Sequence, residues 1–316
     1  MNKNTFIFIG YWPDYEALFI ELARSDDYDI ISIDPRNIIA RFIPVKWIPK
    51  PIRTWLEKRV VHKQLLKYKN DIFIFHETRT IIEALRDSNL EVDAHILMRN
   101  IINPESKTGR CVLELANRGY SVWSFDQADC NHYGFQPYKQ FISACPGIKE
   151  TEIKYDLTFV GRNKGREEVF NQLSTIAKDQ NIKTYFDIKS DGKKKRGGKY
   201  KANISYIEYL TQLCSGACIV DIVQKSQTGL TMRPLEAMIY ERKLLTNNPT
   251  ILNEDFYHPN NILYFQTSND LTDGKLLDFL QKKSIKIDNK TMQSYTLTHL
   301  LCEILKLKNQ LPGNTP

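Results

Sequence analysis

Short apolar runs alternate along this chain with longer segments of amphipathic, helical spacing, and this alternation constrains the fold more than any other feature. Such alternation is typical of α/β proteins in which helices connect parallel strands. In the first half, the apolar runs predict strands at residues 6–9, 30–33, 72–75, 95–98 and 122–125. Each run ends in polar residues or glycine, and ligands of parallel sheets bind at this carboxyl edge of the strands.

The same pattern starts again after the turn-forming segment 145–147, which predicts a second α/β unit. Its predicted strands are residues 157–160, 184–186, 218–223, 244–246 and 262–265, and its predicted helices are residues 166–178, 205–214, 234–241 and 271–283. A last amphipathic helix is predicted at residues 291–308. We therefore expect two Rossmann-like domains, residues 1–150 and 151–290, and a C-terminal helix and tail, residues 291–316, that can cross back to the first domain.

Charge is unevenly distributed along the 316 residues, which carry a net charge of +7. Residues 41–69 contain nine basic residues and one acid, and residues 189–201 contain seven basic residues and one acid. The rest of the chain is therefore mildly acidic, which argues against a uniformly basic nucleic-acid-binding surface. A nucleic-acid-binding protein that uses only these two patches stays open as an alternative, and its binding would depend steeply on salt.

Several motifs are absent, and their absence argues against whole classes of site. No G-x-G-x-x-G follows the first strand and no G-x-x-x-x-G-K-[ST] occurs, so NAD enzymes and P-loop kinases are poor candidates. Without H-E-x-x-H or paired C-x-x-C motifs, we expect no metal site and no cofactor. Six dispersed cysteines and the lack of a membrane-spanning apolar run or a signal peptide predict a protein of the reducing cytoplasm.

The strongest local signal is the run SQTGLTMRPLEAM at residues 226–238, between a predicted buried strand and a predicted helix. Free amides around Thr228 and Gly229, together with the amino end of the helix, would form a phosphate cradle. Gly229 lets the backbone approach closely, and Arg233 adds a fixed positive charge. Glu236 projects away from the apolar face of the helix, where a carboxylate suits ribose hydroxyls; the alternative is an acid that only complements the helix dipole.

These residues resemble a known family, the bacterial GT-B glycosyltransferases of surface polysaccharide (O-antigen, capsule and lipopolysaccharide) biosynthesis. The matching segments are residues 155–162 (YDLTFVGR), the run TGLTMRPLE, residues 243–248 and residues 256–262. The resemblance implies two Rossmann-like domains facing across a cleft, with the acceptor bound by the first and a nucleotide-diphosphate sugar bound by the second. It also implies that no metal ion is obligatory.

The resemblance implies roles for individual residues as well. Gly161 and Arg162 would contact the donor diphosphate, Thr228 and Gly229 would cradle it, and Glu236 would hold the ribose. Residue chemistry alone points the same way, because Arg162, Lys164, Arg166 and Arg233 could supply the positive charge that stabilises a leaving diphosphate; Lys164 and Arg166 could equally be solvated charges at the start of a helix. The E-x7-E signature of many retaining members is missing, since Glu236 is followed by Glu241 and not by an acid eight positions on, so the stereochemistry stays open.

An inverting transfer also needs a group that accepts the proton of the acceptor hydroxyl. The candidates are acids at strand ends in the first half, Asp14, Glu77 and Asp126, and we predict Glu77 and Asp14 as catalytic residues. Glu77 follows the clearest strand and has His76 beside it, although a histidine there is more often a packing residue than a base. Each acid could equally be a turn or helix-cap residue.

The basic segment 41–69 interleaves aromatic and aliphatic residues with Lys and Arg, a composition suited to lying on an anionic bilayer. We expect a cytoplasmic protein bound peripherally to the inner face of the cytoplasmic membrane, where a lipid-linked acceptor would be made. The alternative is an ordinary basic amphipathic helix that packs on its own sheet. The lysine-rich segment 189–201 is expected to form a mobile loop.

The predicted function is transfer of a sugar from a nucleotide-diphosphate sugar to a surface-glycan or lipid-linked oligosaccharide acceptor. A sugar-nucleotide epimerase with the same two-domain layout is the main alternative. The two functions differ in one property, because an epimerase converts its donor when no acceptor is present.

Overall fold

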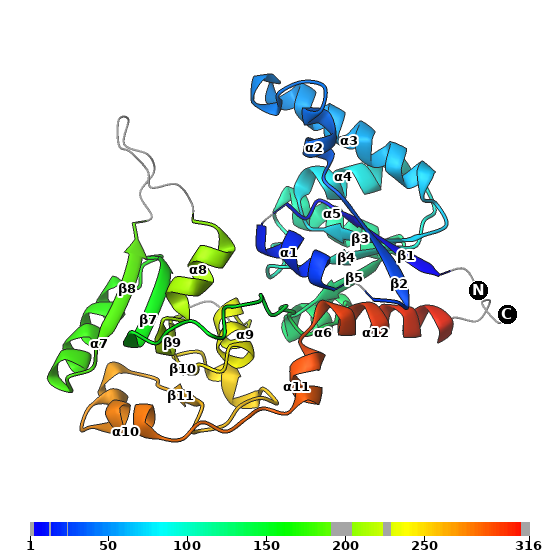
Figure 1. The fold of residues 1–316 in the computed structure, drawn as a ribbon. Helices are drawn as coiled ribbons and strands as arrows, with labels where there is room; N and C mark the ends of the chain where they lie inside the picture. The colour runs from blue at the N-terminus through cyan, green and yellow to red at the C-terminus, as the bar shows by residue number, and fades with distance from the viewer. Residues whose placement is uncertain (1–2, 13, 24, 191–203, 224–228, 311–316) are drawn as a thin grey trace. The chain divides into compact units, whose positions relative to one another are not determined.

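The computed structural model describes residues 3–12, 14–23, 25–190, 204–223 and 229–310. The chain divides into two compact units: unit 1 comprises residues 1–139 and 300–316, and unit 2 comprises residues 140–299. Each unit is built around its own sheet (Figure 1).

Unit 1 contains a six-stranded parallel sheet in the order β2-β1-β3-β4-β5-β6. Its strands are β1 (Asn4–Ile9), β2 (Tyr28–Ile33), β3 (Ile72–His76), β4 (Ala94–Leu97), β5 (Ser121–Ser124) and β6 (Gln136–Pro137). Its helices are α1 (Asp14–Leu22), α2 (Pro35–Ala40), the 3-10 helix η1 (Val45–Trp47), α3 (Lys50–Lys67), α4 (Arg79–Ser88), α5 (Lys107–Asn117), α6 (Gln127–Tyr133) and, from residue 300 onward, α12 (Leu297–Gln310).

Both faces of this sheet are buried, because successive side chains along a strand point to opposite faces. Phe73 and Phe75 of β3 share one core with apolar residues of α3, α4 and α5. Ile72 and Ile74, which alternate with them, are buried as well. The continuous apolar runs seen in the sequence are therefore strands covered on both sides, as parallel strands usually are.

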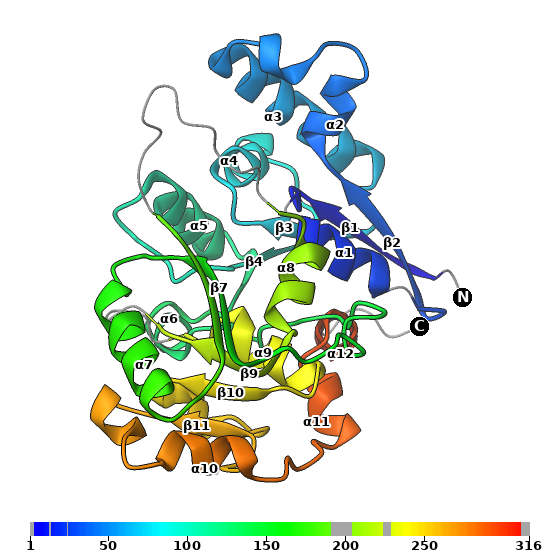
Figure 2. The ribbon, with the colours of Figure 1, turned by 60° about the vertical axis from the view of Figure 1, so that its left-hand side comes forward.

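Unit 2 contains a five-stranded parallel sheet in the order β11-β10-β9-β7-β8. Figure 2 shows β7, β9, β10 and β11 of this sheet. Its strands are β7 (Tyr155–Arg162), β8 (Thr184–Lys189), β9 (Gly216–Asp221), β10 (Lys243–Thr246) and β11 (Ile262–Tyr264). Its helices are α7 (Glu167–Asp179), α8 (Tyr206–Leu213), α9 (Met232–Ile239), α10 (Lys275–Gln281) and α11 (Asn289–Ser294), with 3-10 turns η2 (Pro249–Asn253) and η3 (Ser268–Leu271). One core joins β7 and β9 to α7 and α10.

The predicted α/β class with two parallel sheets is confirmed, and every predicted strand is present. The prediction of one last helix at residues 291–308 is wrong, because two helices, α11 and α12, occupy this region. The break falls at Tyr295, whose carbonyl accepts a hydrogen bond from the Ile142 amide (2.8 Å). Thr296 then starts the second helix by accepting a hydrogen bond from the His299 amide (3.2 Å).

Residues 140–150, which the sequence assigned to the first domain, belong to unit 2. The side chain of Gln140 donates to the Leu230 carbonyl (3.1 Å), and the amide of Cys145 donates to the Tyr240 hydroxyl (2.9 Å). At the other end of the chain, Lys308 of α12 pairs with Asp93 at 2.9 Å within unit 1. Polar contacts such as these hold residues 140–150 in unit 2 and the end of α12 in unit 1. Hydrophobic periodicity carries no information on such contacts, so it could not predict this boundary.

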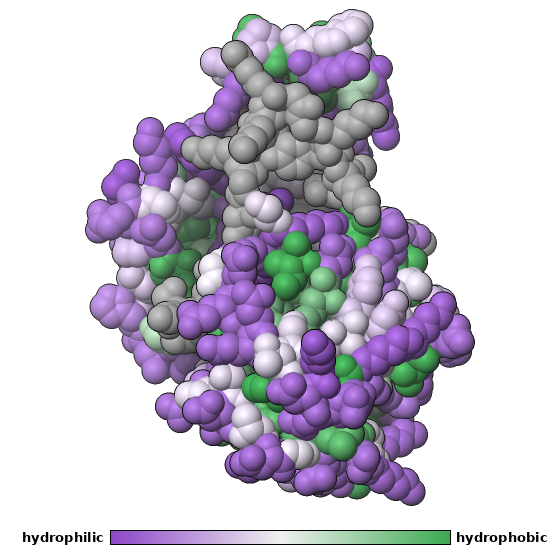
Figure 3. Space-filling model, turned by 90° about the vertical axis from the view of Figure 1, so that its left-hand side faces the viewer, coloured by the Kyte–Doolittle hydropathy of each residue, from purple (hydrophilic) through white to green (hydrophobic). Residues whose placement is uncertain are grey.

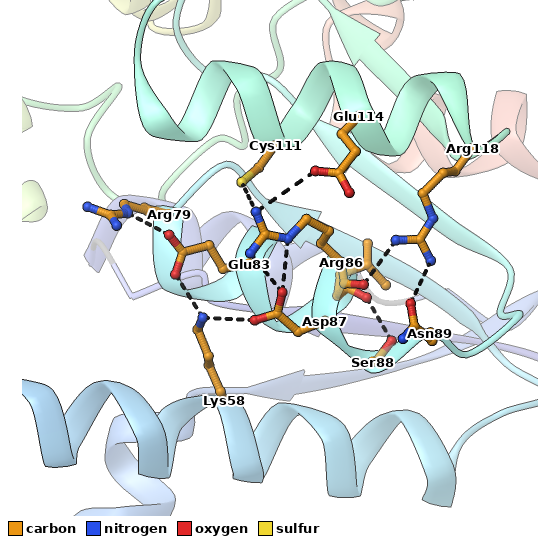
Figure 4. Close-up of polar contacts among 11 residues, drawn as sticks. Lys58, Arg79, Glu83, Arg86, Asp87, Ser88, Asn89, Cys111, Glu114 and Arg118 are labelled. Atoms are coloured by element: carbon orange, nitrogen blue, oxygen red, sulfur yellow. Dashed lines mark hydrogen bonds and ion pairs between the residues drawn. The ribbon is translucent and has the colours of Figure 1, made fainter.

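Charged side chains join three helices on one face of unit 1 (Figure 4). Lys58 of α3 pairs with Glu83 and Asp87 of α4 at 2.8 and 3.0 Å. Arg86 of α4 donates to the sulfur of Cys111 on α5 (3.0 Å). Lys58 is therefore engaged with α4, although it belongs to the basic segment 41–69.

Candidate functional site

The predicted phosphate-binding run lies where β9 ends and α9 begins, at the carboxyl edge of the unit 2 sheet. Asp221 ends β9 with no exposed surface, and its carboxylate accepts hydrogen bonds from Thr231 (2.9 Å) and Thr246 (3.1 Å). Thr231 is the N-cap residue of α9, but its hydroxyl bonds Asp221 and not the helix amides. This buried carboxylate, with its two hydroxyl donors, therefore fixes the start of α9 and the end of β10 against the end of β9.

Arg233, in the first turn of α9, is held from three sides. Its Nη2 donates to the Val160 carbonyl (3.0 Å), its Nη1 lies 3.6 Å from Asp221, and its guanidinium lies 4.5 Å from the ring centre of Phe159. Its buried Nε has no hydrogen-bond partner among the residues that the structure describes. A buried cationic donor without an acceptor is rare in folded proteins. The guanidinium is therefore oriented, with one donor that a ligand could use.

Glu236 has 1% of its surface exposed, and both of its carboxylate oxygens accept hydrogen bonds from phenols of α8. The donors are Tyr206 (3.0 Å) and Tyr209 (2.9 Å). Burial raises the pKa of Glu236, while the nearby Arg233 and the two phenols oppose this shift. A ribose could reach this carboxylate only by replacing the tyrosine hydroxyls.

The end of β7 lies next to β9 in the sheet and brings further predicted residues to the same edge. A Cβ atom added to Gly161 would lie 2.6 Å from Nη2 of Arg233 and 3.0 Å from the ring of Phe159, so the guanidinium needs a glycine beside it. Arg162 and Lys164 follow and are exposed. The structure thus places Gly161, Arg162, Lys164 and Arg233 on one sheet edge.

Arg166, the fourth basic residue of the predicted set, is buried in the scaffold. Its guanidinium donates to the carbonyls of Arg162, Asn163 and Ile222, and so ties the end of β7 to the segment after β9. Arg166 therefore stabilises the carboxyl edge of the unit 2 sheet through these hydrogen bonds.

The predicted cradle residue Gly229 lies shortly before the start of α9. The carbonyl of Gly229 accepts a hydrogen bond from the side chain of Asn248 (3.3 Å), which fixes the backbone just before α9. Thr228 lies outside the described residues, and so does most of the lysine-rich segment 189–201.

In unit 1, the two predicted catalytic acids have different surroundings. Asp14 is exposed and accepts a hydrogen bond from the Tyr15 amide (3.0 Å) at the start of α1. Glu77 accepts hydrogen bonds from the amides of Arg99 (3.0 Å) and Asn100 (3.3 Å) and from the side chain of Asn100. Burial raises the pKa of Glu77, and these hydrogen bonds oppose the shift. Its carboxylate therefore holds the loop that follows β4.

A buried acid that the sequence analysis missed lies nearby. Glu16 of α1 is 1% exposed, and its carboxylate lies 3.1 Å from Nε of Arg99 and 3.4 Å from Nε2 of His76. Burial raises the pKa of Glu16, but the neighbouring His76 and Arg99 outweigh burial and hold it below its usual range. The other imidazole nitrogen, Nδ1, lies 2.8 Å from the hydroxyl of Thr78.

The resulting group runs from hydroxyl to imidazole to carboxylate to guanidinium, and it lies at the carboxyl ends of β1, β3 and β4. Tyr11 adds a buried hydroxyl that has no hydrogen-bond partner within the described ranges, and its ring contacts His76 edge to face at 5.2 Å. Glu16 could have been found from the sequence, because it shares the buried face of α1 with Phe19 and Ile20. An acid on the apolar face of a helix needs a partner.

The surface formed by the segment after α2, by η1 and by the exposed face of α3 is both basic and apolar. Phe42 is 83% exposed and Trp47 is 72% exposed, and Ile52 and Trp55 are exposed beside them. The basic residues Lys46, Lys50, Arg59 and Lys63 are exposed on the same segment. We call these eight residues the basic-aromatic surface; hydrophobic and hydrophilic residues alternate over this end of unit 1 at the top of Figure 3. Within the described residues, no helix is both long and apolar enough to cross a bilayer.

Among the described residues, no group of three or more His, Cys, Asp or Glu side chains could hold a metal ion. No family model matches the chain, and no curated protein matches it.

Solved structures match the chain over nearly its whole length at low sequence identity. The UDP-GlcNAc 2-epimerase from Methanocaldococcus jannaschii has a TM-score of 0.57 at 13% identity, over 97% of this chain and 100% of that chain. Sucrose-phosphate synthase from Thermosynechococcus elongatus has a TM-score of 0.58 at 9% identity, over 98% and 99%. A glycosyltransferase from Rickettsia africae has a TM-score of 0.52 at 9% identity, over 100% of both chains. The chain therefore has the GT-B fold, and the expected fold class is confirmed.

Proposed function

We propose that the protein is a glycosyltransferase that moves a sugar from a nucleotide-diphosphate donor to a surface-glycan or lipid-linked saccharide acceptor. The observation that carries the proposal is Arg233, a guanidinium fixed at the amino end of α9 whose buried Nε lacks an acceptor within the described part of the chain. An anionic phosphate oxygen would satisfy this donor and would also benefit from the positive end of the helix. The GT-B fold adds support for a nucleotide-sugar ligand, because several of the matching structures are UDP-GlcNAc 2-epimerases, and this support is shared with the epimerase alternative.

The donor side of the proposed reaction requires stabilisation of a leaving group. When the bond between the sugar and the diphosphate breaks, negative charge grows on the phosphate oxygen that leaves. Arg233, together with the exposed Arg162 at the end of β7 and the exposed Lys164 just after it, would stabilise this charge without a metal ion. In this proposal Gly161 and Gly229 admit the diphosphate, and Glu236 binds the ribose once Tyr206 and Tyr209 release its oxygens.

On the acceptor side, we assign the proton acceptor to His76 and the role of orienting it to Glu16. A negative Glu16 favours a hydrogen on Nε2 of His76, which leaves Nδ1 as the acceptor facing Thr78. The proton of the acceptor hydroxyl moves to Nδ1, directly or through the Thr78 hydroxyl. The acceptor oxygen bonds to the sugar carbon, and the electron pair of the old bond leaves with the diphosphate. Hydroxyl, imidazole and carboxylate act in this order in serine hydrolases.

The two acids that the sequence singled out have supporting positions in this proposal. Glu77 holds the loop that presents Arg99, and Asp14 lies at the start of the helix that carries Glu16. The proton acceptor would then be a neighbour of both predicted residues.

The basic-aromatic surface favours a transferase over an epimerase, since an epimerase acting on a dissolved sugar nucleotide has no need of it. We propose that this surface lies on the anionic inner face of the cytoplasmic membrane, where a lipid-linked acceptor would be found. Aromatic rings such as Trp47 and Trp55 suit the headgroup level, and lysines suit anionic phosphates.

Replacing Lys46, Lys50, Arg59 and Lys63 with Glu is expected to abolish sedimentation with vesicles rich in phosphatidylglycerol, because each basic residue near such a surface contributes about 1 kcal/mol. Lys58 is left unchanged because it pairs with Glu83 and Asp87. A matched control changes four exposed lysines of unit 2, Lys178, Lys275, Lys282 and Lys290, to Glu. Equal sedimentation of the first variant and the wild type would contradict the membrane proposal.

The enzymatic proposal is tested by titrating the protein with UDP-GlcNAc and a panel of other nucleotide sugars in EDTA, followed by NMR of the mixture. We expect one nucleotide sugar to bind and to stay unconverted, apart from slow release of the nucleoside diphosphate. A radiolabelled sugar should then move into the lipid fraction when source membranes are added. Conversion of the donor into an epimer without an acceptor would favour the epimerase, and no binding of any nucleotide sugar would contradict both functions.

A further inference from the structure

A cavity of about 220 Å³ lies in unit 2, and none of the predicted donor residues that the structure describes lines it. Its walls come from α9, from the starts of β10 and β11, and from the segment between α10 and α11. Its apolar wall residues include Ala237, Met238, Leu244, Phe256, Ile262 and Met292. An enclosed apolar cavity of roughly 150 Å³ holds a benzene molecule, so this partly open space has room for a small apolar group.

The cavity is kept open by the way its outer wall is attached. The side chain of Asn261 makes two hydrogen bonds with the backbone of Ile285: it donates to the carbonyl (2.7 Å) and accepts from the amide (2.8 Å). Asn260 donates to the carbonyl of Lys283 (3.1 Å). Side chains thus hold this segment where a direct strand pairing would bring it closer. Ile285 lines the cavity and still has 46% of its surface exposed, so a bound molecule would cover apolar surface.

The mouth of the cavity is positively charged. Its one acid, Glu241, is already paired with Lys149 at 2.7 Å. The guanidinium of Arg242 donates to carbonyls of four residues, Cys214, Tyr240, Lys149 and Thr151. No ion pair joins Arg242 or the exposed Lys286 to a carboxylate within the described residues. Lys286 is therefore the cation of the lining that a bound anion could pair with, because the guanidinium of Arg242 is already engaged by carbonyls.

We propose that this cavity is a binding site for a small anionic amphiphile, with the apolar chain against Met238 and Met292 and the anionic group at Lys286. The site shares helix α9 with the predicted donor residues. Ala237 and Met238 face the cavity, whereas Arg233 and Glu236 face β7 and α8. A bound amphiphile would therefore contact the helix that positions Arg233, but its binding does not depend on the proposed enzymatic function.

Methionine methyl groups give a direct test, because Met238 and Met292 line the cavity while Met98 lies in unit 1. Full-length protein labelled with [methyl-13C]methionine is titrated with sodium octanoate below its micelle concentration, and in parallel with 1-octanol and octylamine. We expect octanoate to shift the Met238 and Met292 signals saturably and to leave Met98 unchanged. Octanol should bind more weakly, and octylamine should bind most weakly.

Two variants separate the apolar and the charged parts of the proposal. Ala237→Leu, which fills the cavity, is expected to abolish the shifts. Lys286→Glu, an exposed change that should not disturb folding, is expected to weaken octanoate binding at least threefold and to leave octanol binding unchanged. Absence of saturable shifts at Met238 and Met292 would overturn the site. Equal affinity for octanoate and octylamine, with no effect of Lys286→Glu, would overturn its preference for anions.

Discussion

Replacing Arg233 with Leu is expected to weaken binding of the nucleotide-sugar donor by about 10- to 100-fold, because one charge-assisted hydrogen bond contributes about 1.5–3 kcal/mol. The same change is expected to destabilise unit 2 by about 3–5 kcal/mol, since Asp221 has no exposed surface and would lose the cation beside it. Calorimetric titration measures the first effect, and chemical denaturation measures the second.

The two effects can be separated by changing Asp221 as well. Asp221→Asn keeps the side-chain shape but removes the buried negative charge. Its amide oxygen can accept from one of the hydroxyls of Thr231 and Thr246, and its NH2 group would donate to the other. The double variant Asp221→Asn/Arg233→Leu should recover much of the lost stability, because the two groups are in contact and their effects are not additive. It should not recover donor affinity. Wild-type donor affinity in the double variant would show that Arg233 only supports the scaffold.

The sheets were predictable because a parallel strand that is buried on both faces is a continuous run of apolar residues in the sequence. Residues 72–76, Ile-Phe-Ile-Phe-His, are apolar until the strand ends, and their burial on both faces leaves no polar alternation. The two-residue strand β6 at Gln136–Pro137 is not such a run, because it lies exposed at the edge of the sheet. A run of apolar residues indicates a buried strand. An exposed edge strand such as β6 need not be apolar, so the sequence does not reveal it.

The candidate site was predictable in its position but not in its contacts. Strand ends showed where Glu77 and Arg233 would lie, since polar residues follow buried strands there. The sequence could not show that the loop after β4 donates a hydrogen bond to Glu77, or that two tyrosines of α8 donate hydrogen bonds to Glu236. These partners are separated from the acids by more than twenty positions, and hydrogen bonds at such a distance leave no periodic signal.

Glu16 shows the complementary error, in which a local signal was present and not used. Its position three residues before Phe19 places it on the buried face of α1, where an acid must find a cation or a donor. Arg99, which neutralises it, lies 83 positions further along the chain. The need for a partner was thus visible in the sequence, and only the identity of the partner required the fold.

Replacing Gly109 with Ala is expected to destabilise unit 1 by about 3 kcal/mol, although Gly to Ala inside a helix usually stabilises by about 1 kcal/mol. A methyl group on Gly109 would lie 2.0 Å from the carbonyl oxygen of Asn103 and 2.7 Å from its carbonyl carbon. These are backbone atoms, and Ser106 holds them by donating from its hydroxyl to that same oxygen (2.7 Å). Chemical denaturation of the variant measures the loss.

The loop that would have to move is the one that begins at Arg99 and Asn100, which Glu77 holds from β3. Gly109→Ala should therefore disturb the Glu16–Arg99 pair as well as the stability of α5. Arg110→Ala, a change at an exposed position of the same helix turn, is the matched control and should alter stability by less than about 0.5 kcal/mol. A Gly109→Ala variant as stable as the wild type would mean that the carbonyl of Asn103 does not face α5. The loop that carries Arg99 would then not be held against α5, and the position of Arg99 beside Glu16 would be less well supported.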